Sequence, residues 1–180
     1  MDFFGPSLDL YPPPHPASIS REELLKQCTV RMGRTSGPGG QHRNKVETKV
    51  VLTHTPTGIG VHAGERRSAV ENKRVAVFRL RLELATRVRC AVPRGDVRSE
   101  MWRSRVGPEG QIACNPRHQD YPAMLAEAMD MLVSARFEPS SAAARLMVTP
   151  SQLLKLIKAH PPAFVALNEA RAARGKHSLK

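Results

Sequence analysis

The spacing of apolar and polar residues predicts a small antiparallel sheet in the first half of the chain. Residues 29–34 (TVRMGR), 49–55 (KVVLTHT) and 59–62 (IGVH) read as three strands. The sequence Pro-Thr-Gly at 56–58 favours a turn between the second and third segments. A short helix over 20–27 is expected before them, because Ser20 and Glu23 have the spacing of a capping box.

A long helix is predicted to follow the strands. It opens at Ser68, which forms a second capping box with Glu71. One apolar stripe at helical spacing is expected to pack on the sheet, and it consists of Val70, Val77, Leu80, Leu84 and Val88. The other faces of this helix are basic and carry Arg67, Lys73, Arg74, Arg79, Arg81, Arg87 and Arg89.

The second half of the chain predicts helices near 120–135, 139–146, 149–158 and 161–174. Residues 142–157 (AAARLMVTPSQLLKLI) have the spacing of a helix-turn-helix, although Met147 stands where glycine is usual. The predicted fold class is α+β: a small antiparallel sheet packed by a long helix, followed by an all-helical C-terminal module with a helix-turn-helix-like hairpin. We expect a flexible Pro-rich arm at 1–18, a sheet-and-helix domain at 19–92, a linker at 93–118 and the helical module, with a basic tail, at 119–180.

The composition limits the classes of partner that this chain is expected to bind. The 180 residues include 28 Lys and Arg against 16 Asp and Glu, a net charge of +12, which favours a polyanionic partner. No apolar run approaches the roughly 18 residues of a spanning helix, so no membrane partner is expected. Three cysteines without close spacing are typical of a reduced, cytoplasmic protein. Cys114 and His118 lack a second ligand pair, and we predict no metal and no cofactor.

The glycine-rich stretch 36–45 (SGPGGQHRNK) is the main candidate for chemistry. It fits neither the P-loop nor the dinucleotide pattern, and it contains no acid. Gly39 and Gly40 permit positive φ and a close approach of the backbone to a surface. Gln41 offers a backbone N–H, and such a donor held at a developing oxyanion is typically worth about 3 to 4 kcal/mol. This is half of a site, which a partner must complete.

These residues carry a resemblance. Gly39-Gly40-Gln41 within SGPGGQHRN, followed by VVLTHTPTGIGVHAGERRSAVENKRVA, resembles the catalytic GGQ domain of class-I peptide chain release factors. It is also similar to their short relatives that rescue stalled ribosomes. The resemblance covers about 20–89 and includes Asn44, the strand pair around 54–58, Arg67-Ser68 and Asn72-Lys73.

The resemblance implies that Gly39, Gly40 and Gln41 are catalytic. Gln41 would enter the peptidyl transferase centre of the large ribosomal subunit and help water attack the ester of P-site peptidyl-tRNA. The family also makes Gln41 a candidate substrate for a methyltransferase. The expected RNA-binding residues are His42, Arg43, Asn44, Lys45, Arg67, Lys73, Arg74, Arg171, Arg174, Lys176 and Lys180.

Two departures qualify the resemblance. Arg43 stands where relatives often have a small apolar residue, and the chain is half the length of a full release factor, with no counterpart of the codon-reading regions. The leading hypothesis is therefore a monomeric, cytoplasmic, codon-independent peptidyl-tRNA hydrolase whose partners are large-subunit rRNA and peptidyl-tRNA. A non-hydrolytic ribosome- or RNA-binding factor and a DNA-binding regulator that uses the helix-turn-helix are the alternatives.

Overall fold

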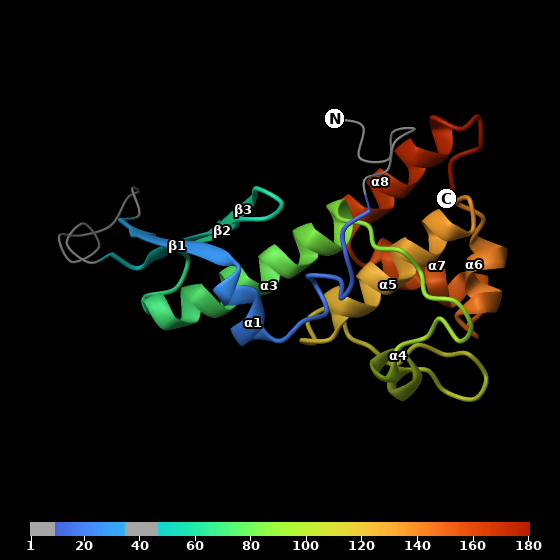
Figure 1. Cartoon of the computed structure of the whole chain (residues 1–180), viewed down its shortest axis with the longest axis horizontal. Helices are drawn as coiled ribbons and strands as arrows, with labels where there is room; N and C mark the ends of the chain where they lie inside the picture. The colour runs from blue at the N-terminus through green and yellow to red at the C-terminus, as the bar shows by residue number, and fades with distance from the viewer. Residues whose placement is uncertain (1–9, 35–46) are drawn as a thin grey trace. The chain divides into compact units, whose positions relative to one another are not determined.

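The structure is a computed structural model, and it describes residues 10–34 and 47–180. The chain forms two compact units (Figure 1). One consists of Ile19–Leu84 and contains the sheet, and we call it the sheet unit. The other combines the residues up to Ser18 with Ala85–Lys180, and we call it the helical unit.

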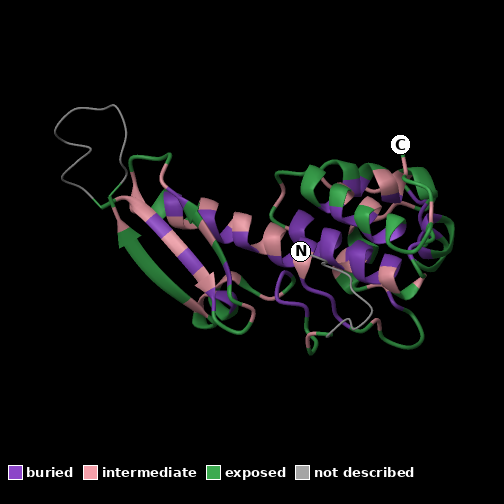
Figure 2. Ribbon diagram, turned by 90° about the horizontal axis from the view of Figure 1, so that it is seen from above, coloured by how far each residue is buried: buried purple, intermediate pink, exposed green. Residues whose placement is uncertain are grey.

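The sheet unit has the predicted α+β architecture. Helix α1 (Arg21–Lys26) leads into strands β1 (Cys28–Gly33), β2 (Lys49–His54) and β3 (Ile59–Ala63), which form an antiparallel sheet in the order β1-β2-β3. Helix α3 (Ala69–Arg87) packs against this sheet. The central strand supplies the core, because Val50 and Leu52 are buried while β1 is largely exposed (Figure 2).

The predicted apolar stripe of α3 is only partly correct. Val77, Leu80 and Leu84 are buried, whereas Val70 is 61% exposed. The fully buried position in the first turns of the helix belongs to Asn72, a polar residue at the other edge of the stripe. Apolar periodicity alone does not predict that a polar amide on the same face is buried for its hydrogen bonds.

Five helices follow in the helical unit. They are α4 (Glu100–Arg105), α5 (Tyr121–Ser134), α6 (Pro139–Arg145), α7 (Pro150–Lys158) and α8 (Pro161–Ala172), so the four predicted C-terminal helices are confirmed. Helix α5 is central, since eleven of its fourteen residues are buried. Among residues 10–34 and 47–180, none of the helices combines the length and apolar character needed to cross a membrane.

The predicted hairpin at 142–157 is formed by α6 and α7. Ala143, Val148 and Leu153 are buried in it, and Met147 takes the left-handed φ of 56° that usually selects glycine. Gly110 lies against this turn, because a Cβ built on it would meet the Val148 Cα at 3.1 Å. The Gln152 side chain also accepts a hydrogen bond from the Ile112 N–H (3.3 Å). Residues 110–112 therefore contact the beginning of α7, which a DNA-reading helix would need to present to a groove.

Two predicted irregular segments are folded. Within 93–118, α4 places the fully buried Trp102 in the core, where its indole N–H donates to the Leu146 carbonyl (3.0 Å). In the described part of the arm, His15 and Ala17 are buried, and Tyr11 forms a bridge with Cys90. Long-range contacts therefore order these residues within the segments predicted as a linker and as an arm.

Candidate functional site

The candidate catalytic loop connects β1 to β2. Its predicted catalytic residues Gly39, Gly40 and Gln41 lie outside the described residues, as do the predicted RNA-binding residues His42, Arg43, Asn44 and Lys45. The residues that hold both ends of the loop are described, and they define the frame of the site.

That frame is a β-hairpin. Gly33 at the end of β1 is the register partner of Lys49 at the start of β2, so both ends of the loop leave from the same end of the sheet. Arg34 and Glu47 extend the pairing, with the Arg34 Nε 3.9 Å from the Glu47 carboxylate. Both side chains are more than half exposed, so this ion pair contributes little to stability.

Asn72 fixes the frame to helix α3. Its amide nitrogen donates to the carbonyl of Thr48 (2.7 Å) and to that of Arg66 (2.9 Å), and its amide oxygen accepts from the Arg66 N–H (2.9 Å). One buried side chain thus joins the residue before β2, the turn after β3 and the first turns of α3. Such a fully satisfied buried amide defines one arrangement of the backbone.

The same contacts bring predicted RNA-binding residues to the base of the loop. Arg67 directly follows Arg66 and is exposed, while Lys73 directly follows Asn72. Arg74 is exposed one position further along α3. Arg79 has a different role, since its guanidinium donates to the His62 carbonyl (2.8 Å) and the Glu65 carboxylate (2.7 Å).

A second buried polar group holds the opposite end of the sheet. His54 is fully buried, with Nδ1 2.8 Å from the Thr57 hydroxyl and Nε2 3.0 Å from the Gln27 amide oxygen. Burial lowers the pKa of His54, so its ring stays neutral near pH 7. Because the Gln27 oxygen only accepts, Nε2 carries the proton. This histidine is a structural tie, far along β2 from the loop.

The predicted RNA-binding residues near the C-terminus lie in the helical unit. Arg171 is buried and donates to the carbonyls of Phe137 and His177, so the prediction that it binds RNA is not supported by its surroundings. The Arg174 guanidinium stacks over the Phe137 ring, 4.4 Å from its centroid. Lys176 forms an ion pair with Glu138, and Lys180 is exposed.

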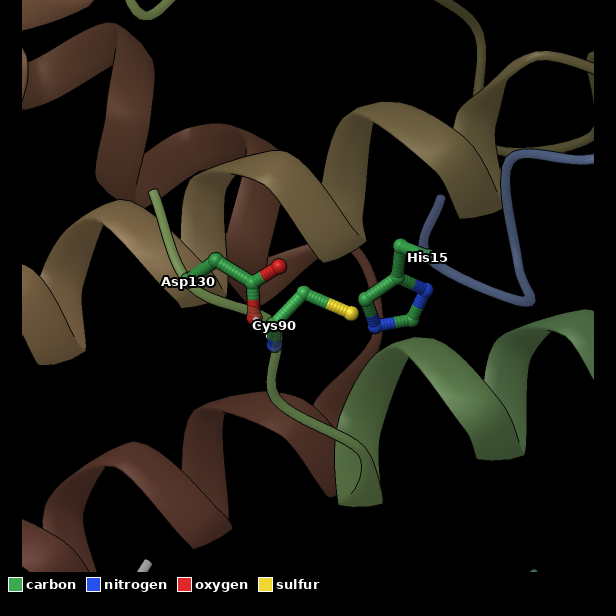
Figure 3. A group of neighbouring side chains, drawn as sticks. All are labelled: His15, Cys90 and Asp130. Carbon is green, nitrogen blue, oxygen red and sulfur yellow. Dashed lines mark hydrogen bonds between the residues drawn. The ribbon is translucent and has the colours of Figure 1, made fainter. Parts of the chain in front are cut away.

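A buried group of ionisable side chains is also present in the helical unit (Figure 3). His15 comes from the N-terminal segment, Cys90 from the chain after α3, and Asp130 from α5. His15 Nδ1 accepts from the Ala17 N–H (3.0 Å), which leaves the proton on Nε2, directed to the Val88 carbonyl (3.2 Å).

Asp130 also has hydrogen-bond partners within the protein. Its Oδ1 accepts from the Arg89 guanidinium (3.2 Å) and from the Cys90 N–H (3.1 Å). A metal ion bound to Oδ1 would have to displace these contacts, and any cation at this cluster would lie beside the Arg89 charge, which opposes it. Burial, with Arg89 nearby, lowers the pKa of His15 to about 3, and burial raises the pKa of Cys90 to about 12. The hydrogen bonds of this cluster, including the one from His15 to the Val88 carbonyl, therefore attach the N-terminal segment to the helices.

Two residues organise these sites in roles that the sequence did not predict: Asn72, which belongs to the resemblance, clamps the loop, and Asp130 is a buried acid. Each interrupts an apolar helical face with a polar side chain, and that interruption is the available signal. A buried polar residue has to be matched by hydrogen-bond partners, which come from segments distant in sequence.

Comparison with known proteins finds a family model that matches the sheet unit and the first part of Ala85–Lys180. The RF-1 domain family matches residues 19–105. An uncharacterized mitochondrial peptide chain release factor-like protein of Saccharomyces cerevisiae is 45% identical over 76 residues, which is 41% of this chain and 46% of that protein. Peptide chain release factor 1 of Acidiphilium cryptum is 35% identical over 145 residues, 72% of this chain and 41% of that protein. Peptide chain release factor 1 of Leptospira biflexa is 31% identical over 137 residues, 67% of this chain and 38% of that protein.

The chain therefore carries a class-I release-factor-like GGQ domain. Each of these matches covers less than half of the relative's own length. The predicted resemblance is confirmed, and it supports a release-factor-like function in protein biosynthesis.

Proposed function

We propose that this protein is a codon-independent peptidyl-tRNA hydrolase that releases nascent peptides from stalled ribosomes. The observation that carries the proposal is the Gly39-Gly40-Gln41 sequence inside a domain of the RF-1 family. The frame supports it, because the hairpin and the Asn72 clamp fix both ends of the loop that bears the motif.

The reaction is hydrolysis of an ester. Water attacks the carbonyl carbon that joins the peptide to tRNA, negative charge develops on oxygen, and the ribose 3′-oxygen leaves. The stretch 36–45 contains no carboxylate to act as a general base. Its contribution is therefore the Gln41 backbone N–H, which would stabilise developing charge by about 3 to 4 kcal/mol. Ribosomal RNA and the tRNA itself supply the rest of the site.

Basic residues beside the loop would position it on RNA. Arg67, Lys73 and Arg74 follow or adjoin the Asn72 clamp, and the chain has a net charge of +12. Codon independence is the finer part of the proposal, and the experiment below tests it directly. Action as a monomer in the cytoplasm and modification of Gln41 by a methyltransferase remain predictions.

The test is peptide release from ribosomes stalled on truncated mRNA. Gln41→Ala keeps the backbone N–H but removes the side chain, whereas Gln41→Pro removes the N–H itself. We expect the proline variant to lose about 10²- to 10³-fold in release rate and the alanine variant to lose less. Gln111→Ala, a change of the same type at an exposed position, should release at the wild-type rate.

The outcomes separate the hypotheses. Undiminished release by both Gln41 variants would overturn the catalytic assignment. Tight ribosome binding without release by the wild type would favour the non-hydrolytic factor. Ribosomes with a stop codon, a sense codon or no codon in the A site provide the second arm, and equal release from all three is expected for codon independence.

A further inference from the structure

Four cations of the helical unit gather at the turn between α5 and α6. The Arg145 guanidinium donates to the Ser134 hydroxyl (2.8 Å), and the Arg174 guanidinium lies over the Phe137 ring. Lys176 forms an ion pair with Glu138. Arg136 lies within the same turn. We call the four residues Arg136, Arg145, Arg174 and Lys176 the turn cluster.

The C-terminal segment is folded onto this turn. The buried Arg171 donates to the Phe137 carbonyl and, through Nε, to the His177 carbonyl (3.0 Å). Asn168 closes the fold further along, since its side chain accepts from the Leu179 N–H (2.8 Å) and donates to the Leu179 carbonyl (3.2 Å). The cations of the basic tail predicted from the sequence are thus held on a structured surface.

The residues around this turn are mostly basic. Residues 134–138 and 170–180, together with Arg145, contain one acid, Glu138, against six bases: Arg136, Arg145, Arg171, Arg174, Lys176 and Lys180. Glu138 is already paired with Lys176. Arg136, Arg145 and Arg174 are all exposed residues. Guanidinium groups bind phosphate oxygens through two parallel hydrogen bonds, which makes such a group suited to a phosphate backbone.

A simpler explanation is compensation of helix dipoles, because α5 ends at Ser134 and α8 ends at Ala172, and cations stabilise helix C-termini. Arg174 fits that explanation, since it donates to the Ala170 carbonyl at the end of α8 (2.9 Å). Arg145 and Lys176 are instead held by side chains, Ser134 and Glu138. Arg136 has a φ of 53° at a position where glycine would be less strained. Dipole compensation therefore leaves much of the cluster unexplained.

We propose that the turn cluster is a second RNA-binding surface, which contacts phosphates of an RNA backbone independently of the GGQ domain. The inference deepens the proposed function and rests on it only in that the ribosome is where such RNA would be met. Binding to free RNA requires no hydrolysis, so the two proposals can fail separately.

The experiment measures binding of the full chain to two fluorescent RNAs, a 20-nucleotide single strand and deacylated tRNA, over a range of salt concentrations. The test variant is Arg136→Gln with Arg145→Gln. The matched control is Arg94→Gln with Arg117→Gln, which removes the same charge from exposed positions elsewhere in the helical unit. Far-ultraviolet circular dichroism and thermal unfolding establish that both variants are folded.

We expect the test variant to bind at least one RNA about tenfold more weakly at low salt. The magnitude of the slope of log K against log salt should fall by roughly 1.4 to 1.8, as two phosphate contacts are lost. The control variant should stay near the wild type. Equal weakening by both variants would show a response to net charge alone and overturn the proposal, as would equal affinity of the test variant and wild type. Gln41→Ala should bind free RNA normally, which separates this result from failure of the hydrolase hypothesis.

Discussion

The amide of Asn72 donates a 2.7 Å hydrogen bond to the carbonyl of Thr48, the residue immediately before β2. Asn72→Ala would leave that carbonyl and the two backbone groups of Arg66 without this partner inside the protein. We expect a loss of about 3 kcal/mol in the free energy of unfolding, measured with urea. Peptide release should slow as well, because small displacements of a catalytic group are costly.

Asn115→Ala is the control for Asn72. Asn115 is exposed, and its side chain accepts one local hydrogen bond from the Arg117 N–H (2.8 Å). We expect a change in stability within about 0.5 kcal/mol and normal release. If Asn72→Ala unfolds at the same urea concentration as the wild type, Asn72 does not clamp the loop.

The buried pair of Arg89 and Asp130 gives a second prediction. Asp130→Asn removes the charge partner of a guanidinium that is 98% buried and should cost about 3 to 5 kcal/mol in stability. The double change Arg89→Met with Asp130→Leu removes both charges and should be more stable than the single variant. Asp96→Asn, which breaks an exposed pair with Arg98, should leave the unfolding curve unchanged. An additive double variant would rule out coupling between the two charges.

Local chemistry explains which features the sequence could predict. The capping box at α1 is formed as expected, with the Glu23 N–H donating to the Ser20 hydroxyl (3.2 Å) and the Ser20 N–H to the Glu23 carboxylate (3.3 Å). The strands and the C-terminal helices follow their apolar periods within a few residues. These features depend on residues only a few positions apart, so a single sequence contains the necessary information.

The features that were missed depend on long-range partners. Trp102 is in a Pro- and Gly-rich segment but is ordered by the Leu146 carbonyl, 44 positions away. His15 is held by Val88, and Arg171 by Phe137. Arginine is mostly exposed in proteins, and the segments around Trp102 and His15 have no clear helical or strand period, so only the tertiary fold supplies the partners that bury these residues. The basic tail was likewise predicted from its charge alone. The charge does not reveal that Arg171 is buried and hydrogen-bonded to backbone carbonyls.

A third prediction compares the stability cost of replacing two glycines with positive φ. Gly110 lies against the α6–α7 turn, and Gly95 serves as the control. Gly110 has φ 75°, and a Cβ there would lie 3.1 Å from the Val148 Cα and 3.3 Å from the Met147 carbonyl. Gly95 has φ 85° with open space around it. Gly95→Ala should cost about 1 kcal/mol through backbone strain, and Gly110→Ala about 1 to 2 kcal/mol more because the neighbouring backbone must move. Thermal unfolding measures both, and equal costs would show that the loop moves away freely.

The last prediction concerns the pH dependence of stability. His15 has a folded pKa lowered to about 3, against 6.5 when unfolded, so the unfolded chain binds the proton more tightly. Its contribution is fully present above pH 6.5 and is lost as the pH falls toward 3, by up to about 1.4 kcal/mol per pH unit.

The neighbouring charges decide how this titration must be measured. Burial raises the pKa of Asp130, and an acid with a raised pKa stabilises the fold as the pH falls, which is opposite in sign to His15. Arg89 remains charged, and the Cys90 thiol remains neutral across this range. The informative quantity is therefore the difference in unfolding free energy between wild type and His15→Gln from pH 7 to pH 4. This difference should fall steadily as the pH is lowered, whereas His177→Gln, a change at an exposed histidine, should leave the wild-type curve unaltered. A difference that stays constant with pH would mean that His15 is not held neutral in the folded protein.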